Sequence, residues 1–280
     1  MATSVTPEIN GYELTDDQVD KLRSWCKGNA GATSSATGET FTRPLAPVLV
    51  GGDLFIYSMS RMFFESYGVR PLVLIAENVK IVTTTKFAEI MYVHGTDDEP
   101  TLLGALKAVS DAVAPCDPML HVLGTGDWYA RTFARNAELL RSWGFTTPYC
   151  DYDTFDSITQ KGIFQGICDK LGIAHPGTYA MPCDESVEAV DPYACPFSFP
   201  VIAKPSNSAA WHYVEFDGKA KVMTVDSAEE LARVYSALRP SCYDKDLLVQ
   251  DMIPGFDESL YSITCFAWKG KVEFSVLGHV

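Results

Sequence analysis

The chain has 280 residues, of which 47% are hydrophobic and 21% charged, so it can fold into two domains of about 100–200 residues and is not a disordered protein. With 36 acidic and 22 basic residues the formal net charge is −14, and no local basic stripe opposes it. Such a field repels a phosphate backbone, so we expect no nucleic-acid partner.

Neither membrane insertion nor a disulfide framework fits the sequence. The most apolar runs, such as PLVLIA at 71–76, are far shorter than the ~20 residues of a membrane-spanning helix, and the N-terminus lacks a signal-peptide layout. The eight cysteines include no CxxC pair, as is typical of reduced thiols rather than of zinc ligands. We therefore expect a cytoplasmic protein with no membrane partner.

The N-terminal segment predicts one short helix. TDDQ at 15–18 is a capping box that marks its start, and Gly28 marks its end. Residues 28–43 are then rich in small and polar residues, as linkers are. We interpret residues 1–45 as an extension plus linker.

An alternation of strands and helices follows. PVLVGGD at 47–53 predicts a buried strand, apolar side chains at helical spacing continue to Gly68, and RPLVLIAEN at 70–78 predicts a second strand. Strand, helix and strand in this order form a βαβ unit, which implies a parallel sheet with helices on its faces.

The same pattern recurs further along the chain. MLHVLGTGD at 119–127 predicts another strand, and Asp127 is expected to cap a helix that Gly144 ends. Residues 46–155 are therefore predicted to form a Rossmann-like α/β domain.

Two glycine turns follow strands of this domain, and each permits two interpretations. GTG at 124–126 resembles a dinucleotide fingerprint, but a tyrosine stands where the third glycine belongs, which favours an ordinary tight turn. In GGD at 51–53, Asp53 caps the next helix, or the small residues leave room for a ligand at the carboxyl end of the strand. In the ligand interpretation, Gly52, Asp53 and Asp127 are the candidate substrate contacts.

The predicted pattern of secondary structure changes near residue 156. SITQ at 157–160 is a second capping box and predicts a helix, with Lys161 near its start on the apolar face, three residues before Phe164. A lysine there either extends its ammonium group to solvent or reaches a buried anion, and both interpretations stay open.

The rest of this region predicts antiparallel strands with one helix across them, an α+β subdomain at 156–255. The helix begins after Ser227, and Asp217-Gly218 is typical of a hairpin turn. The predicted strands are 197–205, 211–216, 219–225 and 246–255.

Lys204 ends an apolar strand, and the alternation of side chains places it on one face with Ile202. A lysine on a buried face needs an anionic partner. SNSAA at 206–210 then offers backbone N–H groups and hydroxyls that can hold phosphate oxygens. The pattern predicts a phosphate site, and a strand-end lysine before a surface hairpin is the alternative.

Several segments, taken in order, resemble the ATP-grasp superfamily. These are Lys161, GIAHPGTY at 172–179, FPVIAKPSNSA at 199–209, SAEEL at 227–231 and LVQDMIPGFDESLYS at 248–262. Within the superfamily, the segments 49–68 and 126–145 are similar to the amino-terminal domain of the carboxylate-amine ligase and D-aspartate ligase group. The resemblance covers residues 46–280.

The resemblance implies an α/β plus α+β fold: a Rossmann-like pre-ATP-grasp domain at 46–155, the small ATP-grasp subdomain at 156–255, and the first strands of a large subdomain at 256–280. It implies ATP held between two subdomains, phosphorylation of a substrate carboxylate, and attack of an amine to give an amide and ADP. The implied partners are small-molecule carboxylates and amines, amino acids above all, and a homodimer is one assembly to test.

Residue roles follow from the same resemblance. Lys161 and Lys204 match the two lysines that hold the ATP phosphates, and Ser206, Asn207 and Ser208 belong to the loop that closes over them.

The adenosine contacts match with two departures. Gln250 stands where the family often has a glutamate that accepts from the adenine amino group, and Asp257 stands where a glutamate usually binds the ribose hydroxyls. Asp251 and Ile253 would offer a backbone carbonyl and N–H to the ring edge.

The Mg²⁺ ligands that this chemistry requires are not found in the sequence. After Asp257 the acidic residues are Glu258 and Glu273, and the last asparagine is Asn207. We therefore expect a fragment of a longer ligase, inactive as given, with the metal ligands in the missing part. The alternatives are a non-catalytic nucleotide-binding or regulatory module and a nicotinamide-dependent oxidoreductase, against which the absent third glycine argues.

Overall fold

The computed structural model describes residues 7–159, 161–207, 211, 214–216, 218–255 and 257–279, and of residues 161, 162 and 257 it describes the backbone alone. The internal contacts divide the chain into two units, Met1–Ser157 and Ile158–Val280. Each unit has its own sheet and its own core, and each is described by itself.

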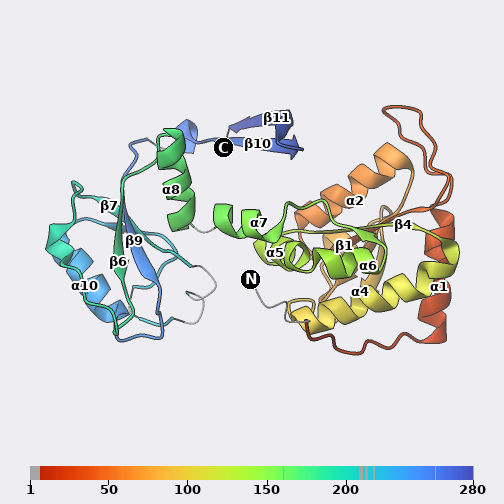
Figure 1. Ribbon diagram of the computed structural model, residues 1–280, viewed down its shortest axis with the longest axis horizontal. Coiled ribbons are helices and arrows are strands. Elements are labelled where there is room, and N and C mark those ends of the chain that lie inside the picture. The colour runs from red at the N-terminus through yellow and green to blue at the C-terminus, as the bar shows by residue number, and fades with distance from the viewer. Residues whose placement is uncertain are drawn as a thin grey trace. The chain divides into compact units, whose positions relative to one another are not determined.

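The first unit is built on a parallel sheet surrounded by helices (Figure 1), and its strand order is β3-β2-β1-β4-β5. All of its strand pairs are parallel, and the central strand β1 is buried along its whole length because helices cover both faces. The strands are β1 Leu45–Val50, β2 Leu72–Ile75, β3 Glu89–Tyr92, β4 Met119–Gly124 and β5 Phe145–Thr146.

Alternate residues of β1 enter two different core clusters. Ala46, Val48 and Val50 pack with side chains of α1, α4, α5 and α6, whereas Leu49 packs with α2 and α3 on the other face. The helices are α1 Asp16–Gly28, α2 Leu54–Tyr67, α3 Lys80–Thr83, α4 Glu99–Val113, α5 Asp127–Arg135, α6 Ala137–Ser142 and α7 Tyr152–Thr159, with a 3-10 turn at Ala114–Cys116.

Helix α1 is an integral part of this core, although it lies in the segment interpreted as an extension. Leu22, Trp25 and Cys26 share one face of the helix and are buried against α4 and the sheet. The predicted capping box is confirmed, because the Thr15 side chain accepts from the N–H of Gln18 and the Gln18 side chain accepts from the N–H of Thr15.

Two predicted helix starts are wrong. Asp127 is the first residue of α5 and caps nothing, because Gly126, with a φ of 95°, takes the N-cap position. Ser157 lies inside α7, whose first turn is instead capped by Asp151 through a bond of 2.9 Å from the Thr154 N–H. Asp151 thus caps a short helix that ends at Thr159, and the predicted helix that carries Phe164 is a second one, which begins at Lys161.

The second unit is built on an antiparallel sheet with the strand order β6-β9-β7-β8. One face of the sheet packs on α10 to form the core of the unit, with Val201, Ala203 and Val249 against Leu231 and other helix residues. The strands are β6 Thr178–Pro182, β7 Val201–Pro205, β8 Met223–Val225 and β9 Asp246–Asp251, and the helices are α8 Lys161–Leu171 and α10 Ala228–Leu238.

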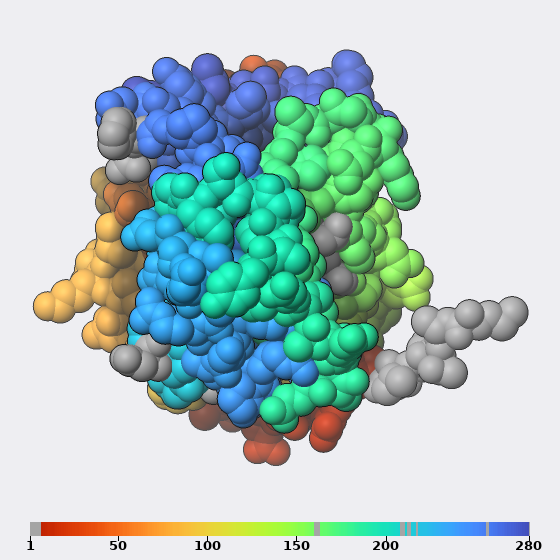
Figure 2. All heavy atoms as spheres, turned by 90° about the vertical axis from the view of Figure 1, so that its left-hand side faces the viewer, coloured from red at the N-terminus to blue at the C-terminus, as the bar shows by residue number. Residues whose placement is uncertain are grey.

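The short 3-10 turn η2, Pro192–Ala194, lies against α10, and the two segments adjoin on the surface in Figure 2. The segment between β6 and β7 therefore runs beside the helix, and its Val190, Cys195 and Phe197 pack against the core of the unit.

The predicted hairpin around Asp217-Gly218 is wrong on its first strand. Residues 214–216 form no strand, and Asp217 lies outside the described residues. Trp211 and Val214 are buried in the core, and a bond of 3.2 Å from the Val214 N–H to the Trp211 carbonyl turns the chain inward. The predicted second strand survives as β8, which pairs with β7.

A separate hairpin ends the described chain. It comprises β10 Tyr261–Trp268 and β11 Lys271–His279, which pair with each other and with no other described strand, after a 3-10 turn at Asp257–Ser259. Apolar side chains are exposed on it, among them Ile263, Phe266, Trp268, Phe274 and Leu277.

The fold class predicted from the sequence is confirmed. A parallel α/β sheet is followed by a separate antiparallel sheet with helices, and β7, which contains Lys204, belongs to a different sheet from β1, which Gly51 follows.

Candidate functional site

Lys204 lies on the sheet face that does not pack on α10. Along β7 the residues Val201, Ala203 and Pro205 are buried, while Ile202 and Lys204 are half-buried on the opposite face. The prediction that the side chains of Ile202 and Lys204 lie on the same face of the strand is thus confirmed, but this face does not pack into the core. Among the side chains that the structure describes, no carboxylate pairs with Lys204, so its ammonium group is available to an anion.

Gln250 lies on the same face as Lys204. In the antiparallel register Gln250 is opposite Ile202 of β7 on one side and Thr178 of β6 on the other, and Lys204 is opposite Leu248. Side chains of directly paired residues share a face, so Gln250 and Lys204 are diagonal neighbours, about 7–8 Å apart at the backbone. Gln250 is 7% exposed and is therefore held in place by its surroundings.

The Gln250 amide is held by a threonine. Its Nε2 donates to Thr178 Oγ1 at 2.7 Å, and Nε2 of Gln165, from α8, donates to the same oxygen. The Thr178 hydroxyl donates in turn to the Pro176 carbonyl at 3.3 Å. No local sequence signal marks Gln165 or Thr178 as site residues, because only the strand pairing brings Thr178 next to Gln250, 72 positions away.

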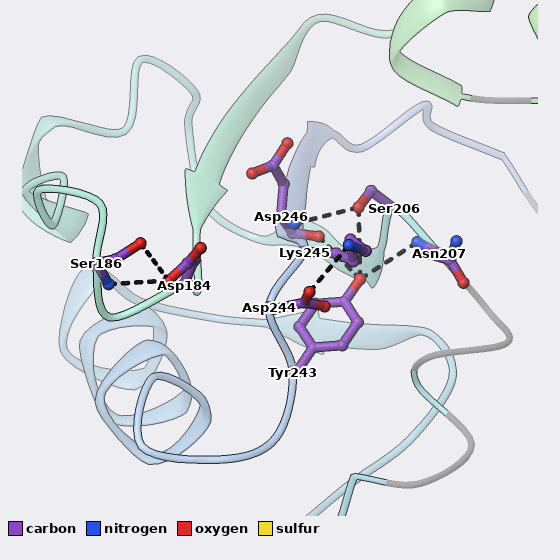
Figure 3. A network of polar contacts seen from close by, with 8 residues as sticks. All are labelled: Asp184, Ser186, Ser206, Asn207, Tyr243, Asp244, Lys245 and Asp246. Atoms are coloured by element: carbon purple, nitrogen blue, oxygen red, sulfur yellow. Dashed lines mark hydrogen bonds and ion pairs between the residues drawn. The ribbon is translucent and has the colours of Figure 1, made fainter. Parts of the chain in front are cut away.

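The residues that follow Lys204 are anchored by a buried tyrosine (Figure 3). The Tyr243 hydroxyl accepts from the Asn207 N–H at 3.2 Å and donates to the Asp246 carbonyl at 3.1 Å. Ser206 exchanges two bonds with Asp246, from the Ser206 N–H to the carbonyl at 3.0 Å and from the Asp246 N–H to the Ser206 Oγ at 3.2 Å. The start of the predicted phosphate loop is therefore a fixed point.

Burial raises the pKa of Tyr243, so its hydroxyl keeps its proton and can donate and accept at once. Its ring also contacts Trp211 edge to face, with centroids 5.2 Å apart. Ser208, the third predicted loop residue, lies outside the described residues.

The remaining predicted nucleotide contacts lie near the ends of two elements. Asp251 is the last residue of β9, and its N–H donates to the Gly177 carbonyl at 3.1 Å. Ile253 follows and is 68% exposed. Lys161 and Asp257 begin α8 and a 3-10 turn, and their side chains lie outside the description.

In the first unit the glycine turns are explained by packing. Gly51 has a φ of 131°, and a Cβ there would lie 2.7 Å from Thr125 Oγ1. A Cβ on Gly124 would lie 2.5 Å from the Tyr129 Cβ. Packing against α5 therefore accounts for Gly124, whereas a Cβ on Gly126 would meet no atom within 4 Å, and its φ of 95° accounts for that glycine.

The three candidate substrate residues sit at one edge of the parallel sheet, because β1 and β4 are neighbours. Asp53 caps α2 by accepting from the Ile56 N–H at 3.0 Å, as one of the two interpretations predicts. A Cβ on Gly52 would lie 3.1 Å from Ile75 Cδ1, so this glycine also serves close packing. Asp127 is exposed at the start of α5.

A surface cavity of about 670 Å³ lies elsewhere in the first unit, between α1 and the edge of the sheet. Trp25, Asn29, Arg70 and Glu89 are among the residues that line it, and none of the predicted site residues does. Trp25 Nε1 and Asn29 Nδ2 both donate to the Arg70 carbonyl, so much of its polar lining is internally paired.

Within the described ranges, no group of three or more histidine, cysteine or acidic side chains is placed to hold a metal ion. In the same part of the chain, no helix has the length and apolar character needed to cross a membrane.

Comparison with known proteins was made by sequence and by structure. No family model matches the sequence. The chain is 26% identical over 235 residues to a D-aspartate ligase of Enterococcus faecium (strain Aus0004), a match that covers 83% of this chain and 56% of the relative. The chain thus spans about half the length of the curated relative that it matches.

Two solved structures are also similar. The L-amino acid ligase from Bacillus licheniformis superposes with a TM-score of 0.50 at 15% identity, over 77% of this chain and 46% of that one. The D-alanine-D-alanine ligase from Helicobacter pylori gives a TM-score of 0.47 at 16% identity, over 84% and 74% of the two chains. The chain has an ATP-grasp-like α/β fold, and its resemblance to the D-aspartate ligase group of carboxylate-amine ligases is confirmed.

Proposed function

We propose that this chain is the nucleotide-binding part of an ATP-dependent carboxylate-amine ligase, which activates a carboxylate as an acyl phosphate and joins it to an amine with release of ADP. The observation that carries the proposal is the shared face of the second sheet. It presents a lysine without a carboxylate partner among the described residues and a buried, oriented amide, beside a loop whose first residues are anchored.

The residues on this face suit the two ends of a nucleotide. The Lys204 ammonium group would neutralise phosphate oxygens, and the N–H groups and hydroxyls of Ser206, Asn207 and Ser208 would add donors. Gln250 would read the base edge, together with the backbone of Asp251 and Ile253. Lys161 is proposed as the second phosphate lysine and Asp257 as the ribose contact.

ATP would supply the phosphoryl group that turns a carboxylate into a good acyl donor, and this chain's own residues would bind and orient it. The relatives' names point to amino acids as the carboxylate and amine, so we propose amino-acid substrates. Gly52, Asp53 and Asp127 are the weakest substrate candidates, because capping and packing already account for Asp53 and Gly52.

Mg²⁺ does not fit the residues described, since they hold no suitable acidic cluster. We propose that further strands of a longer protein provide its ligands, and that this chain alone turns over no ATP. Two features support the proposal: the relative is much longer, and the β10–β11 hairpin leaves large apolar side chains exposed. A lone two-stranded hairpin is at best marginally stable, so it needs covering strands.

A second candidate is a nucleotide-binding or regulatory module without catalysis. The similar proteins are named as ligases, so catalysis is the favoured candidate and this one is the alternative outcome of the test. The two candidates share the nucleotide site and differ only in turnover.

A binding assay tests the proposed nucleotide site, and a turnover assay tests the proposed ligase activity. Calorimetric titration of this chain with ATP and ADP should give weak binding that Lys204→Ala abolishes and that Lys170→Ala, at the exposed end of α8, leaves unchanged. Binding that Lys204→Ala does not weaken would contradict the assigned site.

For turnover, a protein extended to the length of the relative should release ADP in the presence of a matching pair of amino acids. Lys204→Ala should lower that rate by roughly 10² to 10³-fold, because a desolvated phosphate contact is lost. Nucleotide binding without any ADP release across amino-acid pairs would favour the non-catalytic module.

A further inference from the structure

Two glutamine side chains from different elements converge on one hydroxyl group in the second unit. Gln250 of β9 and Gln165 of α8 both donate through Nε2 to Thr178 Oγ1 of β6. Gln250 is also the residue proposed to meet the base of a nucleotide. The orientation of its amide therefore decides whether the site offers that base an acceptor or a donor.

The proton of the Thr178 hydroxyl is already committed. It points to the Pro176 carbonyl, which can only accept. Thr178 Oγ1 is left with two lone pairs, and two amide groups approach it. Each must present its nitrogen, because an amide oxygen would face a lone pair, so Oε1 of Gln250 turns away from Thr178.

The Pro176 carbonyl is itself held. His175 Nδ1 lies 3.0 Å from it, and His175 Nε2 lies 3.0 Å from the Asp169 carboxylate near the end of α8. Both partners are acceptors, so the ring donates from both nitrogens when protonated. The chain of bonds from α8 through Pro176 to Thr178 keeps the threonine proton on one side.

We propose, on the basis of the nucleotide function proposed above, that Thr178 is a positioning residue that locks the Gln250 amide with its oxygen outward, so that the site accepts a hydrogen bond from a 6-amino purine. A carboxylate at this position accepts with either oxygen and needs no lock. A glutamine rotated by 180° would present its NH₂ group to the base and would favour a 6-oxo purine. Thr178 therefore makes glutamine equivalent to the glutamate that the resemblance leads one to expect.

The test measures affinities of the 280-residue chain for ATP, for inosine triphosphate, which carries oxygen in place of the amino group, and for purine riboside triphosphate, which carries neither. We expect the chain to bind ATP about tenfold or more tightly than inosine triphosphate, as one hydrogen bond and one avoided acceptor clash would give. Purine riboside triphosphate should fall between the two, because it loses the bond without the clash.

Thr178→Val should bring ATP and inosine triphosphate to within about threefold of each other, because the amide can then rotate to suit either base. The ratio of the two affinities should change partly because inosine triphosphate binds more tightly to Thr178→Val than to the unmodified chain. A simple loss of structure cannot produce tighter binding. Thr178→Ser should keep the preference, and Gln250→Glu in the Thr178→Val background should restore it. Thr146→Val, on the exposed edge strand β5, is the matched control.

Each result bears on the inference. A preference for ATP that survives in Thr178→Val overturns the role of Thr178 and leaves the nucleotide site intact. Equal binding of the three nucleotides by the unmodified chain overturns base reading by Gln250. Binding of none of them refutes the proposed function, and the inference fails with it.

Discussion

Tyr243→Phe removes one buried hydroxyl group that contacts the first residues of the loop after Lys204. The lost hydroxyl accepts from the Asn207 N–H, donates to the Asp246 carbonyl and lies 3.4 Å from the Ser206 Oγ. The Asp246 carbonyl keeps its bond from the Ser206 N–H. The ring stays, so its packing on the core is kept and no large cavity forms. Tyr243 is only 1% exposed, and water therefore replaces the hydroxyl poorly.

The expected loss follows from these contacts. Three hydrogen bonds of about 0.5–1.5 kcal/mol each are removed. The one with Ser206 is long at 3.4 Å, and Asn207, which is exposed, recovers part of its loss from solvent. We expect the second unit to lose about 1–2 kcal/mol of unfolding free energy. At a urea dependence of about 2 kcal/mol per molar, the midpoint falls by roughly 0.5–1 M.

The assay combines urea unfolding with amide hydrogen exchange. The Asn207 amide should exchange faster in Tyr243→Phe, while amides of β1 in the first unit should not change. Tyr193→Phe, in an exposed 3-10 turn, is the control and should leave both readouts unaltered. An unchanged midpoint together with unchanged exchange at Asn207 would refute the anchoring role.

Three further predictions address packing and pH. Burial raises the pKa of Cys26 and of Cys183 to about 12, so both thiols stay neutral in the fold and ionise at about pH 9 once unfolded. Stability should therefore fall between pH 9 and 12 by about 1.4 kcal/mol per pH unit for each thiol, and urea midpoints of the single alanine variants should show a smaller slope. The pKa of His175 is raised, first by the hydrogen bond to Asp169 and then by the one to the Pro176 carbonyl. The contribution of His175 to the free energy of unfolding is therefore complete below the unfolded pKa of about 6.5 and is lost as the pH rises through the folded pKa. Asp169→Asn should flatten the change in second-unit stability between pH 6 and 8, and an NMR titration should show a lower imidazole pKa. Gly124→Ala should destabilise the first unit by about 1–3 kcal/mol in thermal unfolding, because the new methyl group would overlap α5; a variant as stable as the parent would mean that the turn has room for a ligand after all.

Much of the local structure could be predicted from short stretches of sequence. The capping box at Thr15 and the cap at Asp53 form as predicted, since a cap depends on residues two or three positions away. The alternation along β7 also holds, because adjacent side chains of a strand must point to opposite faces. The placement of Lys204 and Ile202 on the same face of the strand could therefore be predicted from the sequence alone.

Local signals failed where two of them competed. Ser157, the first residue of the predicted capping box, lies within a helix that Asp151 had already started, so one local cap displaced another. The segment expected as a strand before residue 217 instead buries Trp211 and Val214, a choice made by packing against other parts of the unit, which a window of a few residues does not contain.

The sequence by itself determined the class of fold, the strand that carries Lys204, and the resemblance to carboxylate-amine ligases. Only the tertiary structure decided that α1 belongs to the core, that Lys204 faces away from it, and that Thr178 and Tyr243 hold the Gln250 amide and the loop. The physical reason is the range of the interactions. Caps and strand alternation act within a few residues, whereas the partners of a buried polar group are set by strand pairing between distant segments.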